Sequence, residues 1–245
     1  MRLPVLLCSM LLSLFAVDGA RADAACSPRP EHSGQATQYA YVPGTGNCEL
    51  GGDVSEPTVA ISTVDYAGSA ACGRCMRITG PIGSVVARVV DQCPTCAPGS
   101  IDLNAAAYAA IGNSPPFLAP VTWHFTPCPT TGPIRVGIAP GSNAFFLQVK
   151  PIEHRYGIAA LELLTGSGFI PLPRTTAHRF QATSPTVPVP IASPFTIRLT
   201  DTNGQQVVVP GLALTPDTVQ ASAQQLPLCH EDVAAVPVFP FGADE

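Results

Sequence analysis

Nine cysteines are spread unevenly along this chain of 245 residues, and their placement limits its fold more than any other feature. Cys8 lies inside an apolar run near the start. Seven of the other eight fall between Cys26 and Cys128, and the last is Cys229. This uneven distribution predicts a boundary between a cysteine-rich first half and a second half of different construction.

The first two dozen residues have the features of a secretory leader. A positive start is followed by fifteen apolar residues, 3–17, and then by small residues with the A-x-A pattern that signal peptidases cleave. Because a membrane span needs about 20 apolar residues, this run is better explained as a signal peptide over residues 1–24 than as an anchor. The alternative is a short buried helix. We expect a secreted, extracellular, soluble protein with no membrane partner.

Loss of the leader removes Cys8 and leaves an even set of eight cysteines, which in an exported chain predicts disulfides. They are Cys26, Cys48, Cys72, Cys75, Cys93, Cys96, Cys128 and Cys229. The two C-x-x-C pairs also have the spacing of a zinc ribbon, which would need all four thiolates. Export favours the disulfides, so we expect no metal.

Composition excludes several classes of protein. Charged residues make up 12% of the chain, against about 25% in an ordinary domain. A net charge of −5 argues against a nucleic-acid binder, and 46% hydrophobic residues argue against disorder. With 21 glycines and 27 prolines, the chain is expected to be loop-rich and mainly β. No phosphate-loop motif or metal-spaced histidine pair is present, so no cofactor is expected.

The Pro- and Gly-rich stretch 127–133 predicts a linker between two domains. Residues 26–128 are expected to form a compact barrel, and residues 133–225 a β-sandwich. The remainder, 226–245, is expected to be a flexible acidic tail. Predicted strands of the barrel are 58–65, 84–91 and 121–125, and its one helix is 105–111, capped by Asn104 and ended by Gly112. Predicted strands of the sandwich are 134–139, 145–149, 158–164, 195–201 and 206–209, with a hairpin turn at 201–204.

Two aspartates are candidates for chemistry. Asp91 ends an apolar strand beside a cysteine-tied loop, and Asp102 stands just before the predicted helix. Each has a structural alternative: Asp91 could serve only as a hydrogen-bond acceptor, and Asp102 only as a helix cap.

Several motifs, occurring in order, give the first half a specific resemblance. They are Gly34-Gln-Ala-Thr37-Gln-Tyr39, Cys72-Gly-Arg-Cys75, Asp91-Gln-Cys-Pro-Thr-Cys96 and Ser100-Ile-Asp102-Leu-Asn. This half resembles the six-stranded double-psi β-barrel of expansins. The second half resembles the immunoglobulin-like sandwich of carbohydrate-binding family 63 through Gly141-Ser-Asn143, Phe145-Phe-Leu-Gln-Val149 and His154-Arg-Tyr156.

The resemblance implies a monomer that binds plant cell-wall polysaccharide, cellulose or hemicellulose, and loosens it without hydrolysis. Thr37, Tyr39, Asp91 and Asp102 would line the polysaccharide groove. Asp102 matches the general acid of related family-45 glycoside hydrolases, but Tyr41 stands where their catalytic base would be. Glycoside cleavage normally needs two carboxylates, so we expect no hydrolysis.

Three alternatives stay open. Asp91 could be a second carboxylate and make the protein a glycoside hydrolase, or Asp102 alone could serve a lytic transglycosylase of the double-psi barrel class. The protein could also be a pure binding or inhibitor module.

The second domain departs from the family in its aromatic residues. Phe145 and Phe146 occupy the region of a tryptophan pair, and Ala177 stands where a tyrosine is expected. The two phenylalanines could bind polysaccharide or pack in the sandwich core. The single tryptophan, Trp123, is expected in the core of the barrel, and Cys93 replaces an aromatic residue in the groove.

Overall fold

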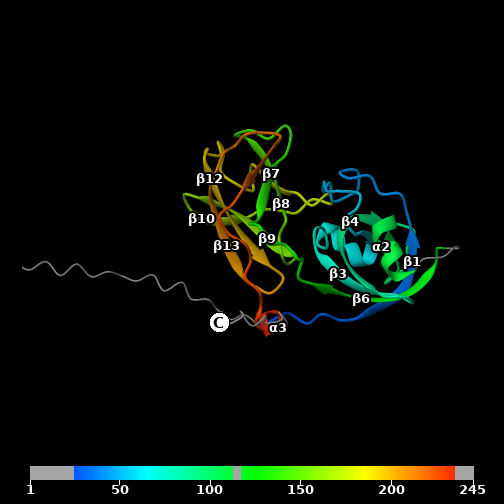
Figure 1. Ribbon diagram of the computed structural model, residues 1–245. Coiled ribbons are helices and arrows are strands. Elements are labelled where there is room, and N and C mark those ends of the chain that lie inside the picture. The colour runs from blue at the N-terminus through cyan, green and yellow to red at the C-terminus, as the bar shows by residue number, and fades with distance from the viewer. Residues whose placement is uncertain (1–24, 113–116, 235–245) are drawn as a thin grey trace, which may run out of the picture.

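The computed structural model describes residues 25–112 and 117–234. The predicted signal peptide lies outside these residues. Two β domains stand side by side, with a short C-terminal helix, α3, below the sandwich (Figure 1). Within the described residues, no helix is long and apolar enough to cross a membrane.

The first domain is a closed six-stranded barrel with strand order β1-β5-β2-β4-β3-β6. The β1–β5 and β2–β4 pairs are parallel and the other pairs are antiparallel. Its elements are β1 (His32–Gln38), β2 (Thr58–Ser62), α1 (Thr63–Tyr66), η1 (Ala67–Ser69), β3 (Cys75–Thr79), β4 (Ser84–Cys93), β5 (Ile101–Leu103), α2 (Ala105–Ile111) and β6 (Ala119–Thr126).

The helix predicted over 105–111 is confirmed with its caps. The Asn104 side chain accepts a hydrogen bond from the Ala107 amide, and Gly112 follows the last turn. The strand predicted over 58–65 is correct only as far as Ser62. Its hydroxyl accepts a bond from the Asp65 amide and so starts the short helix α1 instead.

A close backbone contact positions β5 beside β1. Gly34 in β1 and Gly99 in the turn before β5 face one another so closely that a Cβ at Gly34 would lie 2.5 Å from the Gly99 carbonyl carbon. Gly99 also has φ +81°, a conformation that L side chains rarely adopt. Trp123, buried in the barrel core as predicted, donates from Nε1 to the Gly99 carbonyl at 2.8 Å. This turn therefore fixes the position of β5, the strand that carries Asp102.

The second domain is a sandwich of two four-stranded antiparallel sheets, β10-β9-β12-β13 and β11-β8-β7-β14. Its core is separate from that of the barrel. The turn predicted at 201–204 joins β12 to β13. The strands are β7 (Arg135–Ile138), β8 (Phe146–Ile152), β9 (Ile158–Thr165), β10 (Gly168–Pro171), β11 (Phe180–Thr183), β12 (Phe195–Asp201), β13 (Gln206–Leu212) and β14 (Thr218–Ala221).

The expectation of a flexible tail from residue 226 is wrong for residues 226–234. Leu226 and Cys229 are buried in the sandwich core cluster, and α3 (His230–Ala234) follows. Cys229 forms a disulfide with Cys26, which ties this segment to the start of the described chain. Residues 235–245 lie outside the described residues.

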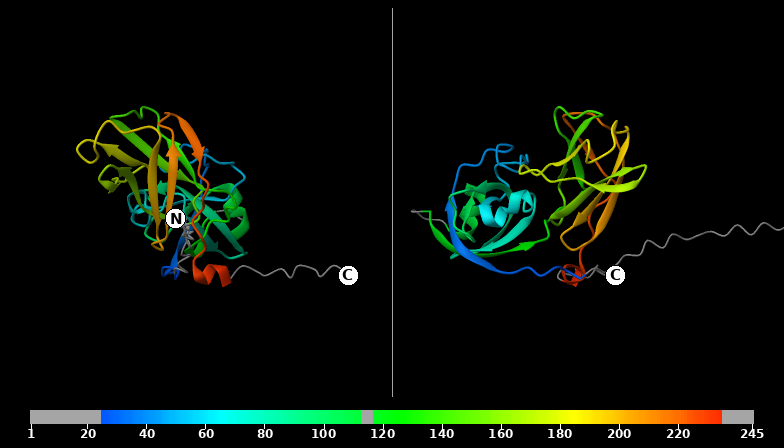
Figure 2. Two further views of the ribbon diagram at one scale, coloured as in Figure 1. Left: turned by 90° about the vertical axis from the view of Figure 1, so that its left-hand side faces the viewer. Right: turned by 180° about the vertical axis from the view of Figure 1, so that it is seen from behind.

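The N-terminal strap, residues 25–31, runs from this disulfide to β1, so it passes from the sandwich to the barrel (Figures 1 and 2). Ser27 donates from its hydroxyl to the Thr202 carbonyl at 2.7 Å, and Arg29 forms an ion pair with Asp232. The two domains are therefore joined twice, by the linker and by the strap.

Candidate functional site

Four register-aligned residues form a row across the barrel. Thr37 of β1 pairs with Asp102 of β5, Asp102 pairs with Ala60 of β2, and Ala60 pairs with Asp91 of β4. Residues paired across neighbouring strands point to the same side of a sheet. Val59 and Ile61 belong to the barrel core, so the intervening Ala60 faces outward. The structure thus brings the two predicted aspartates, each partly exposed, to the outer side of the sheet on either side of Ala60, which is itself buried.

Asp102 lies in a half-buried position at the centre of this row. Its Oδ1 accepts a hydrogen bond from the Thr37 hydroxyl, and its Oδ2 lies 3.6 Å from the Cys93 sulfur. Burial raises the pKa of Asp102, so this carboxyl keeps its proton to a higher pH than a free aspartate. The helix-cap alternative is wrong, because Asp102 belongs to β5 and Asn104 is the cap.

Asp91 is held by the backbone. Its Oδ1 accepts hydrogen bonds from the amides of Asn47 at 2.7 Å and Gln92 at 2.8 Å. The loop that carries Asn47 lies directly against β4, since a Cβ at Gly46 would be 2.5 Å from the Val90 carbonyl. The position of Asp91 is therefore fixed by the fold.

The two tyrosines after β1 differ in their surroundings. The Tyr39 hydroxyl is buried without a hydrogen-bond partner among the described residues, and burial raises the pKa of Tyr39. Its ring centroid lies 6.1 Å from that of Tyr41. The Tyr41 hydroxyl donates to the Leu50 carbonyl at 2.8 Å. Tyr41 is thereby engaged with the loop that follows it.

Both phenylalanines lie outside the sandwich core, so the alternative that they pack there is wrong. Phe145 is 64% exposed and precedes β8, and Phe146 is its half-buried first residue. Alternation along β8 places Leu147 and Val149 in the core and leaves Phe146 and Gln148 on the outer face.

A polar network that the sequence did not reveal links this face to the barrel. Glu49, two residues after Asn47, forms ion pairs with Lys150 at 3.2 Å and with Arg179. Arg179 also donates to the Gln148 side chain at 3.1 Å. Although partial burial opposes it, the hydrogen bonds from Arg179 and Lys150 lower the pKa of Glu49. No sequence signal marks these contacts, because 101 residues separate Glu49 from Lys150 and 130 separate it from Arg179.

The predicted cysteines form four disulfides in the structure, and the zinc alternative is wrong. The pairs are Cys26–Cys229, Cys48–Cys72, Cys75–Cys128 and Cys93–Cys96. The four C-x-x-C cysteines thus divide among three bridges and do not gather around one centre. Cys93–Cys96 lies beside Asp102, where its sulfurs are bonded to one another. Several disulfides are typical of proteins that fold in an oxidising compartment.

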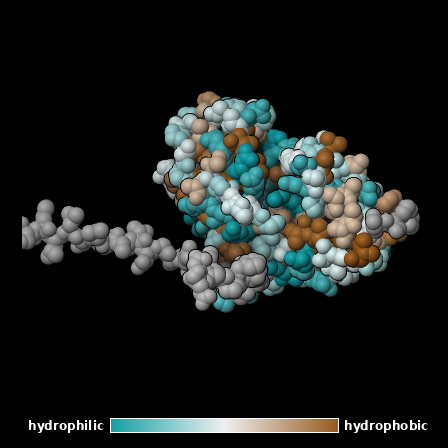
Figure 3. Space-filling view, viewed as in Figure 1, coloured by the Kyte–Doolittle hydropathy of each residue, from teal (hydrophilic) through white to brown (hydrophobic). Residues whose placement is uncertain are grey.

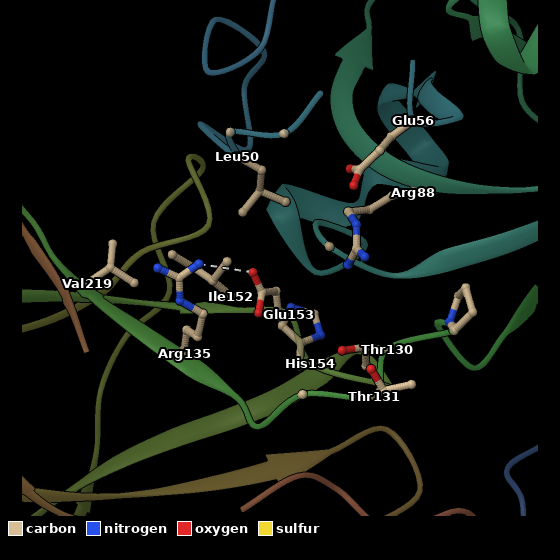
Figure 4. A pocket seen from close by; sticks show the side chains of 15 residues that line it. Leu50, Glu56, Arg88, Thr130, Thr131, Arg135, Ile152, Glu153, His154 and Val219 are labelled. Atoms are coloured by element: carbon tan, nitrogen blue, oxygen red, sulfur yellow. Dashed lines mark hydrogen bonds and ion pairs between the residues drawn. The ribbon is translucent and has the colours of Figure 1, made fainter. Parts of the chain in front are cut away.

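A separate cavity of about 590 Å³ lies between the domains and contains none of the predicted site residues. Figure 4 shows Arg88 directed into it from the barrel, with Glu56 beside Arg88. On the sandwich side, Arg135 and Glu153 form an ion pair at 3.1 Å. Two arginines and two glutamates line this cavity, so their formal charges cancel. Hydrophilic side chains also dominate the surface where the two domains meet in Figure 3.

Comparison with known proteins agrees with this architecture. The Barwin family matches residues 58–115, within the barrel. Expansin-YoaJ of Bacillus subtilis is 23% identical over 177 residues, which cover 71% of this chain and 74% of that protein. Expansin-like protein 2 of Dictyostelium discoideum is 33% identical over 145 residues, 53% of this chain and 35% of that protein.

Solved structures extend the likeness to both domains. The crystal structure of the apo expansin of Clavibacter michiganensis has a TM-score of 0.74 at 29% identity and covers 82% of this chain and 100% of that one. A point mutant of the same expansin, crystallised in complex with cellohexaose, gives a TM-score of 0.75 at 29% identity with the same coverage. The chain is therefore an expansin-like protein, with a double-psi β-barrel of the Barwin type followed by a β-sandwich.

Proposed function

We propose that this protein is exported, binds cellulose or hemicellulose of plant cell walls, and loosens the wall without cutting its chains. The observation that carries the proposal is the row formed by Thr37, Asp102, Ala60 and Asp91 on the outer face of the barrel. It offers a sugar chain a hydroxyl and two partly exposed carboxyl groups, one on either side of the buried Ala60. Complex formation between the similar Clavibacter expansin mutant and cellohexaose supports the same ligand class here.

We propose that bound polysaccharide extends from this row to the sandwich. Asn47 contacts Asp91, Glu49 lies two residues further along the same loop, and Arg179 connects Glu49 to Gln148. Phe146 shares the outer face of β8 with Gln148, and the exposed Phe145 precedes it. Aromatic rings stack on the apolar faces of sugars, and the polar side chains can bond sugar hydroxyls. In this proposal the two phenylalanines replace a larger aromatic row.

Two features support action without hydrolysis. Tyr41 stands where the related family-45 glycoside hydrolases have their catalytic base, and its hydroxyl donates to the Leu50 carbonyl. Because its pKa is raised, Asp102 can act as a proton donor to a bound sugar. Without a second carboxylate as base, it can hold the sugar but no group activates the water that hydrolysis needs.

One observation favours a second candidate, a glycoside hydrolase that uses Asp102 as acid and Asp91 as base. Both aspartates pair with Ala60 from opposite sides, so their backbones are two strand spacings apart, each about 4.8 Å. The carboxyl groups of an inverting pair lie about 6.5–9.5 Å apart. The strand spacing is therefore close to what such an enzyme needs.

The test measures wall extension and reducing ends with the same protein on cellulose, xyloglucan and β-glucan. The proposal expects extension of wall strips with no release of reducing ends, and loss of most of that extension in Asp102→Asn. Asp53→Asn, a change at an exposed carboxylate of the barrel, is the matched control and should behave like the wild type.

Release of reducing ends that falls about 10²–10⁴-fold in Asp102→Asn would reject the proposal and establish the hydrolase. The Asp91→Asn variant then separates the two mechanisms further. If Asp91 is a hydrolytic base, this change should abolish the release of reducing ends. If Asp91 only binds the polysaccharide, the change should only weaken affinity.

A further inference from the structure

A second cavity, of about 220 Å³, lies where the N-terminal strap, the barrel and the sandwich meet. The strap forms one wall, the end of β6 another, and the segments before β9 and after β12 the third. Figures 1 and 2 show the strap and the end of β6 running toward the sandwich at this junction. The residues that matter below are Ser27, Arg29, Arg74, Phe125, Gly157 and Asn203.

Arg74 is packed on both sides in the wall of this cavity. Its guanidinium carbon lies 3.3 Å from the centroid of the Phe125 ring, which is a cation–π contact. On the other side it packs on Gly157, where a Cβ would approach the Arg74 Cδ to 2.7 Å. A side chain at position 157 would therefore displace Arg74 from its place between the two domains.

This guanidinium has no counter-charge. Its side chain makes no hydrogen bond or ion pair with any residue in the described part of the chain. Desolvation by burial and repulsion by Arg29 lower the pKa of Arg74 to about 10, so it remains charged at neutral pH. Arg29 is already paired with Asp232. Arg74 is partly exposed, and a partly desolvated cation without a counter-ion is less stable than a paired one, so a bound anion would stabilise it.

The other lining residues also suit an anion. None of them is acidic, in contrast to the balanced charges of the cavity in Figure 4. The Asn203 side-chain oxygen accepts a hydrogen bond from the Ser27 amide at 2.9 Å, which sets the orientation of the amide group. Its nitrogen, Nδ2, is buried without an acceptor among the described residues. The site therefore combines a free guanidinium fork with an unused amide donor.

We propose that this cavity binds a small oxyanion, with Arg74 as its principal ligand. A guanidinium recognises the paired oxygens of a carboxylate or a phosphate through parallel hydrogen bonds. The anion could be a free ion or the carboxylate of an acidic sugar. Because its walls come from three parts of the chain, an occupant would hold the strap, the barrel and the sandwich together.

The test is calorimetric titration of the full mature protein with sodium phosphate and, separately, with sodium galacturonate, at ionic strength matched with sodium chloride. Glucose serves as the uncharged counterpart of galacturonate. Saturable binding of an oxyanion, absent with glucose and chloride, is expected. Binding of both anions identifies a general oxyanion site, and binding of galacturonate alone identifies an acidic sugar as the source.

Variants assign the site. Arg74→Gln should weaken binding about tenfold or more, the factor carried by charge-assisted hydrogen bonds. Arg77→Gln, at an exposed arginine three residues along, should leave it unchanged. Asn203→Asp keeps the acceptor for the Ser27 amide but adds a negative charge, so it should weaken binding at least as much as Arg74→Gln. It provides the test if Arg74→Gln fails to fold. No saturable binding of either anion, or undiminished binding by Asn203→Asp, would overturn the proposal.

Discussion

The exposed ring of Phe145 offers a direct test of the sandwich as a polysaccharide-binding surface. Phe145 is 64% exposed and contributes nothing to the sandwich core, whereas Phe180 of the same domain is 1% exposed. The variant Phe145→Ala should therefore separate binding from stability. Its free energy of unfolding should change by less than about 0.5 kcal/mol, as is usual for surface substitutions.

The expected loss of affinity follows from ring stacking. An aromatic contact contributes about 0.5–1.5 kcal/mol beyond its buried area, which corresponds to roughly a 2- to 12-fold rise in the dissociation constant. Phe146→Ala should give a smaller binding loss with some loss of stability, because that ring is half-buried. The matched control Phe180→Ala should cost about 3–5 kcal/mol of stability through the cavity it leaves.

The assay is a depletion isotherm on insoluble cellulose, combined with urea unfolding of the same samples. A binding role for Phe145 is refuted if Phe145→Ala binds cellulose as the wild type does. It is also refuted if that variant loses as much stability as Phe180→Ala, since the ring would then be part of the core.

Two further predictions concern stability. In the chain-entropy treatment, removing the Cys26–Cys229 bridge, with its sequence separation of 203, should cost up to about 5 kcal/mol. Removing Cys93–Cys96, with a separation of 3, should cost no more than about 2 kcal/mol. Unfolding midpoints of the double serine variants in urea without reductant compare the two, and equal losses would contradict this account. The second prediction concerns His154, whose ring is fully buried, so that desolvation lowers its pKa from 6.5 to about 3. Between these two pH values the imidazole of His154 is protonated in the unfolded chain and neutral in the folded chain. The free energy of unfolding should therefore fall as the pH drops from about 6.5 toward 3, by up to about 1.4 kcal/mol per pH unit. The same urea midpoints measured from pH 7 to pH 4 should show this slope, and His154→Gln should reduce it; an unchanged slope would remove His154 as its cause.

Elements whose ends carry side-chain signals could be predicted from the sequence. Asn104 and Gly112 mark both ends of α2, and the Asp-Thr-Asn-Gly turn joins two apolar runs that become β12 and β13. The strand β5 has only three residues and owes its place to pairing with β1 and β2, so no local pattern announces it. Such short barrel strands are defined by distant partners.

Some residues of the candidate site could likewise be predicted from the sequence and others could not. Family motifs place Asp91 and Asp102, but their common partner, Ala60, carries no signal because an alanine in an apolar strand resembles any core residue. The contacts of Glu49 with the sandwich depend on how two domains dock, which periodicity within either domain does not encode. Long-range contacts also explain why residues 226–234 are packed. Cys229 is buried in the sandwich core and bonded to Cys26, and neither contact is visible in the local sequence.

The bridge between Cys26 and Cys229 also determines how the molecule carries mechanical load. It brings two residues 203 positions apart to a Cα separation of 5.1 Å and so closes a covalent ring around both domains. Tension applied to the two ends of the chain passes through this bond and leaves the barrel and the sandwich unstretched. A single backbone cut in the linker 127–133 likewise leaves the halves attached, because the ring then becomes one continuous strand. A protein that works between polymers under strain would thus keep its two domains together while its surroundings move.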